Sequence, residues 1–148
     1  MNPDCLFCKI AAKTVPAKIV YEDDRAMAFL DITPRAPGHT MVIPKYHAPT
    51  LAELPDAEVA PLFLAVKKTA ELLLTGLHPD GITIGMNQGR ASGQEIDHLH
   101  VHLMPRWHGD GGGAVQSLVH PSISSGRANA PQESLDEIAK KILDSEKN

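Results

Sequence analysis

The clearest pattern in the chain is a strict alternation of histidine and aliphatic residues at 98–104, closed by Pro105. Alternation with a period of two is typical of a β-strand, whose successive side chains point to opposite faces. The pattern therefore predicts a strand with His98, His100 and His102 on one face and aliphatic side chains on the other.

These three imidazoles have little structural use on a strand. Each can act as a nucleophile, a general acid or base, or a metal ligand. A His-rich tract can also be an incidental metal binder or a tag, but a tag would be terminal and contiguous. We therefore expect the histidine face to be functional.

Further strands and one helix are predicted around this stretch. Residues 17–21 and 25–31 read as a hairpin, 39–44 as a third strand and 82–86 as a fourth. A helix is predicted from about residue 56 to residue 75, because apolar residues recur there at intervals of three and four. That apolar stripe comprises Val59, Leu62, Phe63, Val66, Ala70, Leu73, Leu74 and Leu77.

Two residues bear on the ends of this helix. Pro61 lacks an N–H and crowds the preceding turn, so the regular helix is expected to begin only near it. Gly76 is expected to supply a left-handed cap at the other end.

The remainder of the chain is predicted to be irregular before a final helix. Residues 108–130 are rich in glycine and read as a mobile loop. Ser134 and Glu137 suit a capping box for a short C-terminal helix that reaches Leu143. No repeat is apparent, so the pattern predicts one α+β domain over residues 1–148.

Composition limits the class of protein. The chain has 148 residues, 43% hydrophobic and 22% charged, which is ordinary for a globular domain. A formal charge of −4 gives no basic field for nucleic acid, so no nucleic-acid partner is expected. No apolar run could span a bilayer and no secretory signal is apparent, so we expect a cytoplasmic protein with no membrane partner.

Two cysteines three residues apart, Cys5 and Cys8, form a C-x-x-C pair. Such a pair is either a redox motif or half of a zinc site. A redox pair normally follows a strand, and none is predicted here, so the metal is favoured. A structural zinc ion needs two further ligands, and the chain has eight histidines. Two free thiols are the alternative.

Other polar positions suggest a ligand site without proving one. The loop at 87–95 could turn N–H groups towards a phosphate, although most such loops only connect strands. Asp31 could bind the hydroxyl pair of a ribose, but a solvated strand end is the better interpretation from these residues alone. His39 or His47 could reach the three histidines, which sequence spacing cannot decide.

Taken together, these motifs resemble those of the histidine triad (HIT) family. Residues 98–104 match its signature, His-φ-His-φ-His-φ-φ, in which φ is an apolar residue. The resemblance covers roughly residues 5–107, the expected core of the domain, and leaves 108–148 as a glycine-rich loop and C-terminal helix. The other matching segments are residues 5–10, 20–24, 29–32 and 37–47, together with Asn87, Gly93 and Gln94.

The resemblance implies a fold and a chemistry. The fold is a five-stranded antiparallel sheet with one long helix, usually paired into a homodimer. The reaction is hydrolysis or transfer at the α-phosphate of a nucleotide through a covalent nucleotidyl-histidine. His100 matches the nucleophile, His102 the residue that holds phosphate oxygens with the loop backbone after Ser92, and His39 the supporting histidine.

The resemblance also implies the remaining site residues. Asp31 would hold the ribose hydroxyls. The second nitrogen of the nucleophile needs an acceptor that fixes its tautomer, and we expect a main-chain carbonyl there. Residues expected on the phosphate side are Asn87, Gly93, Gln94 and Glu95, and those expected around the base are Phe7, Ile10, Phe29 and Ile32. Family members with this C-x-x-C hold a structural zinc ion through the residues that are here Cys5, Cys8, His47 and His98.

Two departures keep the substrate open. Glu95 stands where the phosphoramidase branch commonly has a small hydroxyl residue, and a carboxylate there would repel phosphate unless protonated, hydrogen-bonded or turned away. Residues 104–107 resemble the ending of dinucleotide hydrolases. We therefore expect a nucleoside phosphoramidase, with a dinucleoside polyphosphate hydrolase and a zinc-bearing binding module of little turnover as the alternatives.

Overall fold

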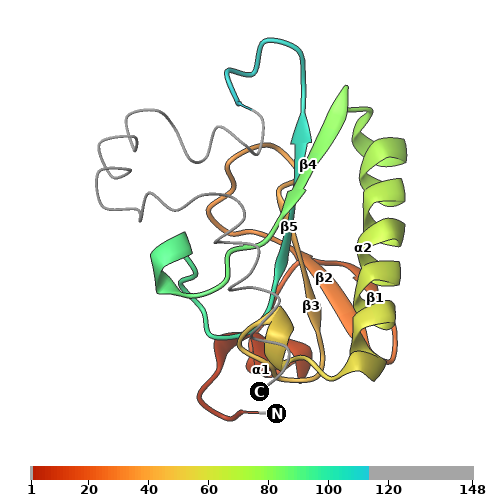
Figure 1. Ribbon diagram of the computed structural model, residues 1–148. Helices are drawn as coiled ribbons and strands as arrows, with labels where there is room; N and C mark the ends of the chain where they lie inside the picture. The colour runs from red at the N-terminus through yellow and green to blue at the C-terminus, as the bar shows by residue number, and fades with distance from the viewer. Residues whose placement is uncertain (1, 114–148) are drawn as a thin grey trace, which may run out of the picture. The chain divides into compact units, whose positions relative to one another are not determined.

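A computed structural model of the chain describes residues 2–113, which form a five-stranded antiparallel sheet and two α-helices. The strands lie in the order β1-β2-β3-β5-β4, and the long helix runs beside the sheet (Figure 1). The predicted α+β fold is confirmed. In chain order the elements are α1 (Leu6–Ala11), β1 (Ile19–Glu22), β2 (Ala26–Leu30), β3 (Thr40–Pro44), the 3₁₀ turn η1 (Leu51–Glu53), α2 (Asp56–Leu77), β4 (Gly81–Gly85), the 3₁₀ turn η2 (Arg90–Ser92) and β5 (Val101–Arg106).

Two apolar cores lie on opposite faces of the sheet. Alternate residues of the strands separate between them: on β2, for example, Ala28 belongs to the core under α2, whereas Phe29 belongs to the core under α1. On β5, Val101 and Leu103 lie in the core under α2. The polar face of the histidine stretch is therefore turned away from α2.

The histidine strand is shorter at its start than the alternation predicts. β5 begins at Val101, so His98 and His100 lie just before it, and it continues through Pro105 to Arg106. The apolar partners of the alternation are nevertheless fully buried. The residues that pair β5 with β3 end at Leu103, so Pro105 lies where β5 pairs only with β4, and its missing N–H is tolerated there.

The long helix begins at its predicted residue and differs from the prediction in how Pro61 is accommodated and in how the helix ends. α2 begins at Asp56 and contains Pro61, which forfeits only one backbone bond near the start of a 22-residue helix. Gly76 lies inside the helix, and His78 instead adopts the left-handed conformation with φ 47° and ψ 48°. The N–H of His78 donates to the carbonyl of Leu74 and closes the last turn.

The buried face of α2 is also narrower than the predicted stripe. Phe63, Leu74 and Leu77 are 41%, 46% and 42% exposed, whereas Ala65 and Thr69 are buried. The predicted stripe covers a wider arc than one sheet face can bury, and the buried face of the helix consists of Leu62, Ala65, Val66, Thr69 and Leu73.

One helix was not predicted, and some predicted segments lie beyond the described residues. The short helix α1 was not predicted, because six residues are too few to show helical periodicity. The predicted C-terminal helix near residues 134–143 and residues 114–130 of the predicted loop lie outside the described residues, and a single domain over 1–148 stays a prediction. No described helix combines the length and apolar character needed to cross a bilayer.

Candidate active site and metal centre

Four side chains from three distant segments converge beside α1. Cys5 and Cys8 come from the N-terminal segment, His47 follows β3, and His98 precedes β5. The Cys5 sulfur lies 3.4 Å from Nδ1 of His98, and the Cys8 sulfur lies 3.4 Å from Nδ1 of His47 and 3.6 Å from Nδ1 of His98. The two Nδ1 atoms are 3.4 Å apart. We call these four residues the metal cluster.

The metal cluster has the dimensions of a tetrahedral zinc site. Zn–S bonds of about 2.3 Å and Zn–N bonds of about 2.0–2.1 Å give S···N edges of about 3.6 Å and an N···N edge of about 3.3 Å. The observed separations agree with these edges. Two thiolates and two imidazoles are also the donor set that zinc prefers, so the residues fit this metal.

The groups around the metal cluster keep the His98 imidazole neutral, with one nitrogen able to bind a metal. Nε2–H of His98 donates to the carbonyl of Pro44 at 2.9 Å, which leaves Nδ1 with its lone pair directed into the metal cluster. Burial lowers the pKa of His98 to about 4, so its imidazole is neutral at pH 7. Burial also raises the pKa of the Cys8 thiol, so a metal must displace the proton when it binds.

The nucleophile candidate, His100, is held in one tautomer. Its Nδ1 lies 2.7 Å from the carbonyl oxygen of His98, which can only accept, so Nδ1 carries the proton. The predicted main-chain acceptor is thereby confirmed. Nε2 keeps its lone pair, and no described residue is hydrogen-bonded to it. Phe7 lies edge-on against the ring, with centroids 5.3 Å apart, and limits its rotation.

A second histidine pair forms a hydrogen-bonded chain beside His100. Nε2 of His39 lies 2.9 Å from Nδ1 of His102. The backbone N–H of Arg35 donates to Nδ1 of His39 at 3.3 Å, and an N–H cannot accept, so this nitrogen is unprotonated. Nε2–H of His39 must then donate to His102, whose own proton lies on Nε2. We call Arg35, His39 and His102 the donor chain.

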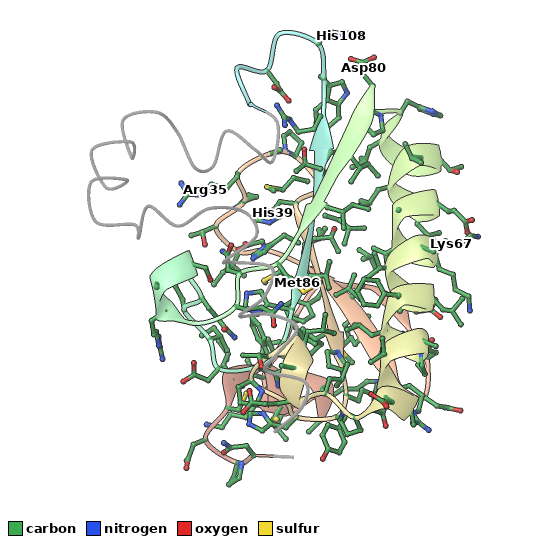
Figure 2. The ribbon with its side chains drawn as sticks, viewed as in Figure 1. Arg35, His39, Lys67, Asp80, Met86 and His108 are labelled. Carbon is green, nitrogen blue, oxygen red and sulfur yellow. The ribbon has the colours of Figure 1, made fainter. Side chains whose placement is uncertain are left out.

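Burial favours the uncharged form of both imidazoles in the donor chain. It is the main cause that lowers the pKa of His102 to about 4, and it also lowers the pKa of His39. Asp31 opposes this effect from 3.4 Å away at Nδ1 of His39. Arg35 and His39 lie on the segment that leads into β3, on the opposite side of the sheet from Lys67 of α2 (Figure 2).

The loop between β4 and β5 is built around Gln94. The side-chain oxygen of Gln94 accepts the Gly89 N–H at 2.6 Å, and its amide donates to the carbonyls of Pro49 and Ile96. Gly89 and Gly93 both have positive φ, of 82° and 91°, which a residue with a Cβ would adopt only with strain. Gln94 is buried, so its amide shapes the loop from within.

The remaining predicted phosphate-side residues differ in position. Asn87 lies beside Gly93, with its Nδ2 3.7 Å from where a Cβ would stand. The Glu95 side chain is exposed, while its backbone carbonyl accepts Nη1 of Arg90 at 2.9 Å. Arg90 also bonds Asp97, so it closes the loop that leads to the histidines.

The residues predicted around the base are not all on one surface. Phe7, Ile10 and Phe29 are buried in the core under α1. Ile32 is 94% exposed, directly after Asp31, and is the one of the four that a bound base could cover. Asp31 is fixed by its Oδ1, which accepts the Thr33 N–H at 2.8 Å.

Three supporting groups were missed from the sequence. The N–H of Arg35 and the carbonyl of Pro44 are backbone groups, which leave no sequence signal. Arg90 is a charged loop residue whose partners become apparent only in the fold. Only the glycines around Arg90 pointed to a structured loop.

Comparison with known proteins identifies the family. The family model of the HIT domain matches residues 12–109. An uncharacterized HIT-like protein of Methanocaldococcus jannaschii is 50% identical over 72% of this chain and 82% of its own length. An adenylylsulfatase of Arabidopsis thaliana is 38% identical (83% of this chain, 62% of its own), and an adenosine 5′-monophosphoramidase of Schizosaccharomyces pombe is 37% identical (69% and 74%).

Solved structures agree with these relatives. A protein of Streptococcus mutans superimposes with a TM-score of 0.77 at 37% identity, covering 96% of this chain and 87% of that one. A zinc-bound histidine triad protein of Mycobacterium smegmatis superimposes with a TM-score of 0.69 at 39% identity, covering 73% and 78%. The chain therefore belongs to the histidine triad (HIT) family of nucleotide hydrolases and transferases.

Proposed function

We propose that the protein cleaves purine nucleoside phosphoramidates at the α-phosphate through a covalent nucleotidyl-His100. The observation that carries this proposal is the bond from Nδ1–H of His100 to the His98 carbonyl, which fixes the tautomer with a free lone pair on Nε2. A neutral imidazole so oriented is a nucleophile, and a covalent step divides a difficult hydrolysis into two easier transfers.

The first transfer forms a bond between Nε2 of His100 and the α-phosphorus. The phosphorus–nitrogen bond of the substrate breaks, and the leaving amine takes up one proton from solvent water. The donor chain fixes the tautomer of His102 that carries Nε2–H. This N–H donates to a phosphate oxygen as negative charge develops. Water then attacks phosphorus and gives up one proton to the solvent, the bond from phosphorus to Nε2 breaks, and the nucleoside monophosphate and neutral His100 are released.

Substrate recognition is assigned to residues around this centre. Asp31 holds the ribose hydroxyls through its carboxylate, and Ile32 covers the base, because its side chain is bare and lies next to the carboxylate. Asn87 and Gly93 are assigned to the phosphate side. The N–H groups of Gly93 and Gln94 already donate to the carbonyls of Arg90 and Gly89, so the loop backbone expected to hold the phosphate after Ser92 has no free N–H at these two residues. The named activities of the Arabidopsis and Schizosaccharomyces relatives, on adenylyl sulfate and adenosine monophosphoramidate, support an adenosine nucleotide.

Arg106 favours a phosphoramidase over a dinucleoside polyphosphate hydrolase. A second nucleotide would need a free cationic contact near the end of β5. Arg106 instead donates Nε–H and Nη2–H to the Asp110 carboxylate and Nη1–H to Thr83 and the Gly113 carbonyl. Its side chain therefore stabilises the turn after β5 and is not available to a polyphosphate.

We also propose that Cys5, Cys8, His47 and His98 hold a structural zinc ion. The matching edge lengths and the zinc-bound relative of Mycobacterium smegmatis support this assignment. Bound there, zinc would tie α1 to the segment before β5, and four protein ligands leave no open position for water. Two copies of the chain are proposed to pair, as the family resemblance implies. The half-exposed Phe63 and Leu74 of α2 and Ile84 of the edge strand β4 support this pairing.

The test of the proposed function compares AMP release from adenosine 5′-phosphoramidate and from diadenosine tetraphosphate. Faster release from the phosphoramidate is expected. Faster release from diadenosine tetraphosphate would replace the proposal by the dinucleotide hydrolase. If neither substrate is cleaved while AMP still binds, the protein is a binding module.

A further inference from the structure

One residue, His98, connects the metal cluster to the nucleophile. Its imidazole Nδ1 lies 3.4 Å from the Cys5 sulfur and 3.4 Å from Nδ1 of His47. Its carbonyl oxygen accepts Nδ1–H of His100 at 2.7 Å. Because imidazole and carbonyl belong to the same residue, a change in how the side chain is held also changes the position of the acceptor.

Phe7 provides a second connection that does not involve His98's backbone. It lies on α1 between the two cysteines and is 4% exposed. Its ring packs edge-on against His100, with centroids 5.3 Å apart and an interplanar angle of 85°, and against Phe29 at 5.4 Å. Any metal bound by Cys5 and Cys8 therefore also fixes the ring that limits His100.

We infer that the metal cluster is a positioning element for the nucleophile, with His98 and Phe7 as positioning residues, an inference that rests on the proposed function. Without a metal, Nδ1 of His98 faces only two thiols, which are weak donors, and a second imidazole. α1 then keeps only its apolar contacts, and the Phe7 ring can shift away from His100.

Other bonds keep this region folded when the metal is removed. Nε2–H of His98 still donates to the Pro44 carbonyl at 2.9 Å, and the N–H of Leu99 still donates to the Ala48 carbonyl at 2.7 Å. Metal loss therefore releases the orientation of His100 without unfolding the sheet. Metal occupancy sets turnover through geometry, although zinc takes no part in the chemistry.

The first experiment strips zinc from the full chain with a chelator under reducing conditions and then titrates zinc back. We expect an unchanged far-UV circular dichroism spectrum, a kcat for adenosine 5′-phosphoramidate lower by about 10- to 100-fold, and a KM within threefold. In ¹⁵N spectra the His100 ring, assigned with His100→Gln, should change from one tautomer to a mixture, and zinc should restore both properties.

The results that would overturn this inference differ from those that would overturn the proposed function. Unchanged kcat and an unchanged His100 tautomer in the stripped, folded protein would overturn the inference and leave the proposed function standing. If the zinc-loaded protein releases no AMP at all, the proposed function fails, and the tautomer signal alone decides whether the metal positions His100.

A second variant keeps the inference testable if the stripped chain unfolds. Phe7→Leu in the zinc-loaded protein should lower kcat about tenfold, with the zinc content unchanged. Leu6→Ala is the matched control, because Leu6 lies on the same helix and is half-exposed. A raised KM with normal kcat in Phe7→Leu would overturn the inference, since it would make Phe7 a wall of the base pocket only.

Discussion

Two histidine-containing groups lie within a few residues of each other in this protein, and they differ in how their nitrogens meet. In the metal cluster, four pairs of donor atoms stand 3.4–3.6 Å apart, and all four donor atoms lie within 4.8 Å of one another. In the donor chain, Nε2 of His39 and Nδ1 of His102 are only 2.9 Å apart. The first spacing suits two ligands of one ion, and the second suits a shared proton.

Burial does not distinguish the two groups. It lowers the pKa of both His98 and His102 to about 4, so both imidazoles are neutral at pH 7. The two histidines differ in which ring nitrogen carries the proton and in the group that this nitrogen or its neighbour contacts. His98 donates its Nε2–H to a carbonyl and keeps the Nδ1 lone pair for a metal, whereas His102 accepts a hydrogen bond at Nδ1 and keeps Nε2–H for a substrate. The neighbouring groups, rather than the residue type, decide the chemistry.

The largest expected effect comes from His100, which lies between the two groups. His100→Ala should lower kcat by about 10⁴- to 10⁶-fold, because the covalent intermediate cannot form. Steady-state AMP release measures this loss, and His108→Ala is the control, since that histidine is exposed and outside both groups. Residual activity within 100-fold of the native protein would exclude His100 as the nucleophile.

Removal of the metal should have the next largest effect, on stability. Structural zinc contributes about 10–16 kcal/mol to isolated zinc fingers, and retaining even 3 kcal/mol of this would shift the Tm by roughly 10 °C. Differential scanning calorimetry of Cys8→Ala and of chelated native protein should give similar decreases. Protein purified with reduced thiols that contains no zinc would contradict the assignment of the metal cluster.

The donor chain should affect rate more than stability. His39→Leu removes the donor to His102 and should lower kcat by about 10²-fold. His39→Gln should recover part of the rate, because its amide can still donate. If the Leu and Gln variants turn over equally, the proton direction assigned to the chain is wrong.

Acid should weaken the fold through His102. Its pKa is about 4 in the folded protein, below the ordinary value of 6.5, so the unfolded chain binds more protons between these values. Its contribution to stability is therefore complete above pH 6.5 and is lost as the pH falls towards 4. Urea unfolding of His102→Gln should show a flatter dependence on pH over this range than the native protein. An identical slope would remove His102 as the cause.

Glu95 should have the smallest effect. Its side chain is exposed, so water screens its charge from the phosphate site. Glu95→Gln should change kcat/KM for adenosine 5′-phosphoramidate by less than about threefold. A tenfold increase would show that the carboxylate faces the phosphate and opposes substrate binding.

The sequence predicted the sheet and the polar face of the histidine stretch because both depend on local alternation. Leu99, Val101 and Leu103 are buried as the pattern requires, even though the strand begins only at Val101. The start of a strand depends on its neighbour, and β3 pairs with β5 only from Val101 onwards. For the same reason, the buried side of α2 could not be read from apolar spacing alone.

Fewer features of the site than of the fold could be predicted from the sequence. His47 meets Cys8 across 39 residues, and only the family resemblance suggested the set that they form with Cys5 and His98. The N–H of Arg35 and the carbonyl of Pro44 decide which nitrogens carry protons, yet almost any residue supplies such groups. Tautomers follow from tertiary geometry, which residue identities do not encode.

The most direct test of the account is mass spectrometry of protein quenched during turnover of adenosine 5′-phosphoramidate. We expect an adenylyl group on the peptide that contains His100, absent from His100→Ala and lost as AMP is released. An adduct on another residue, or full turnover with no adduct in either protein, would contradict a covalent mechanism through His100.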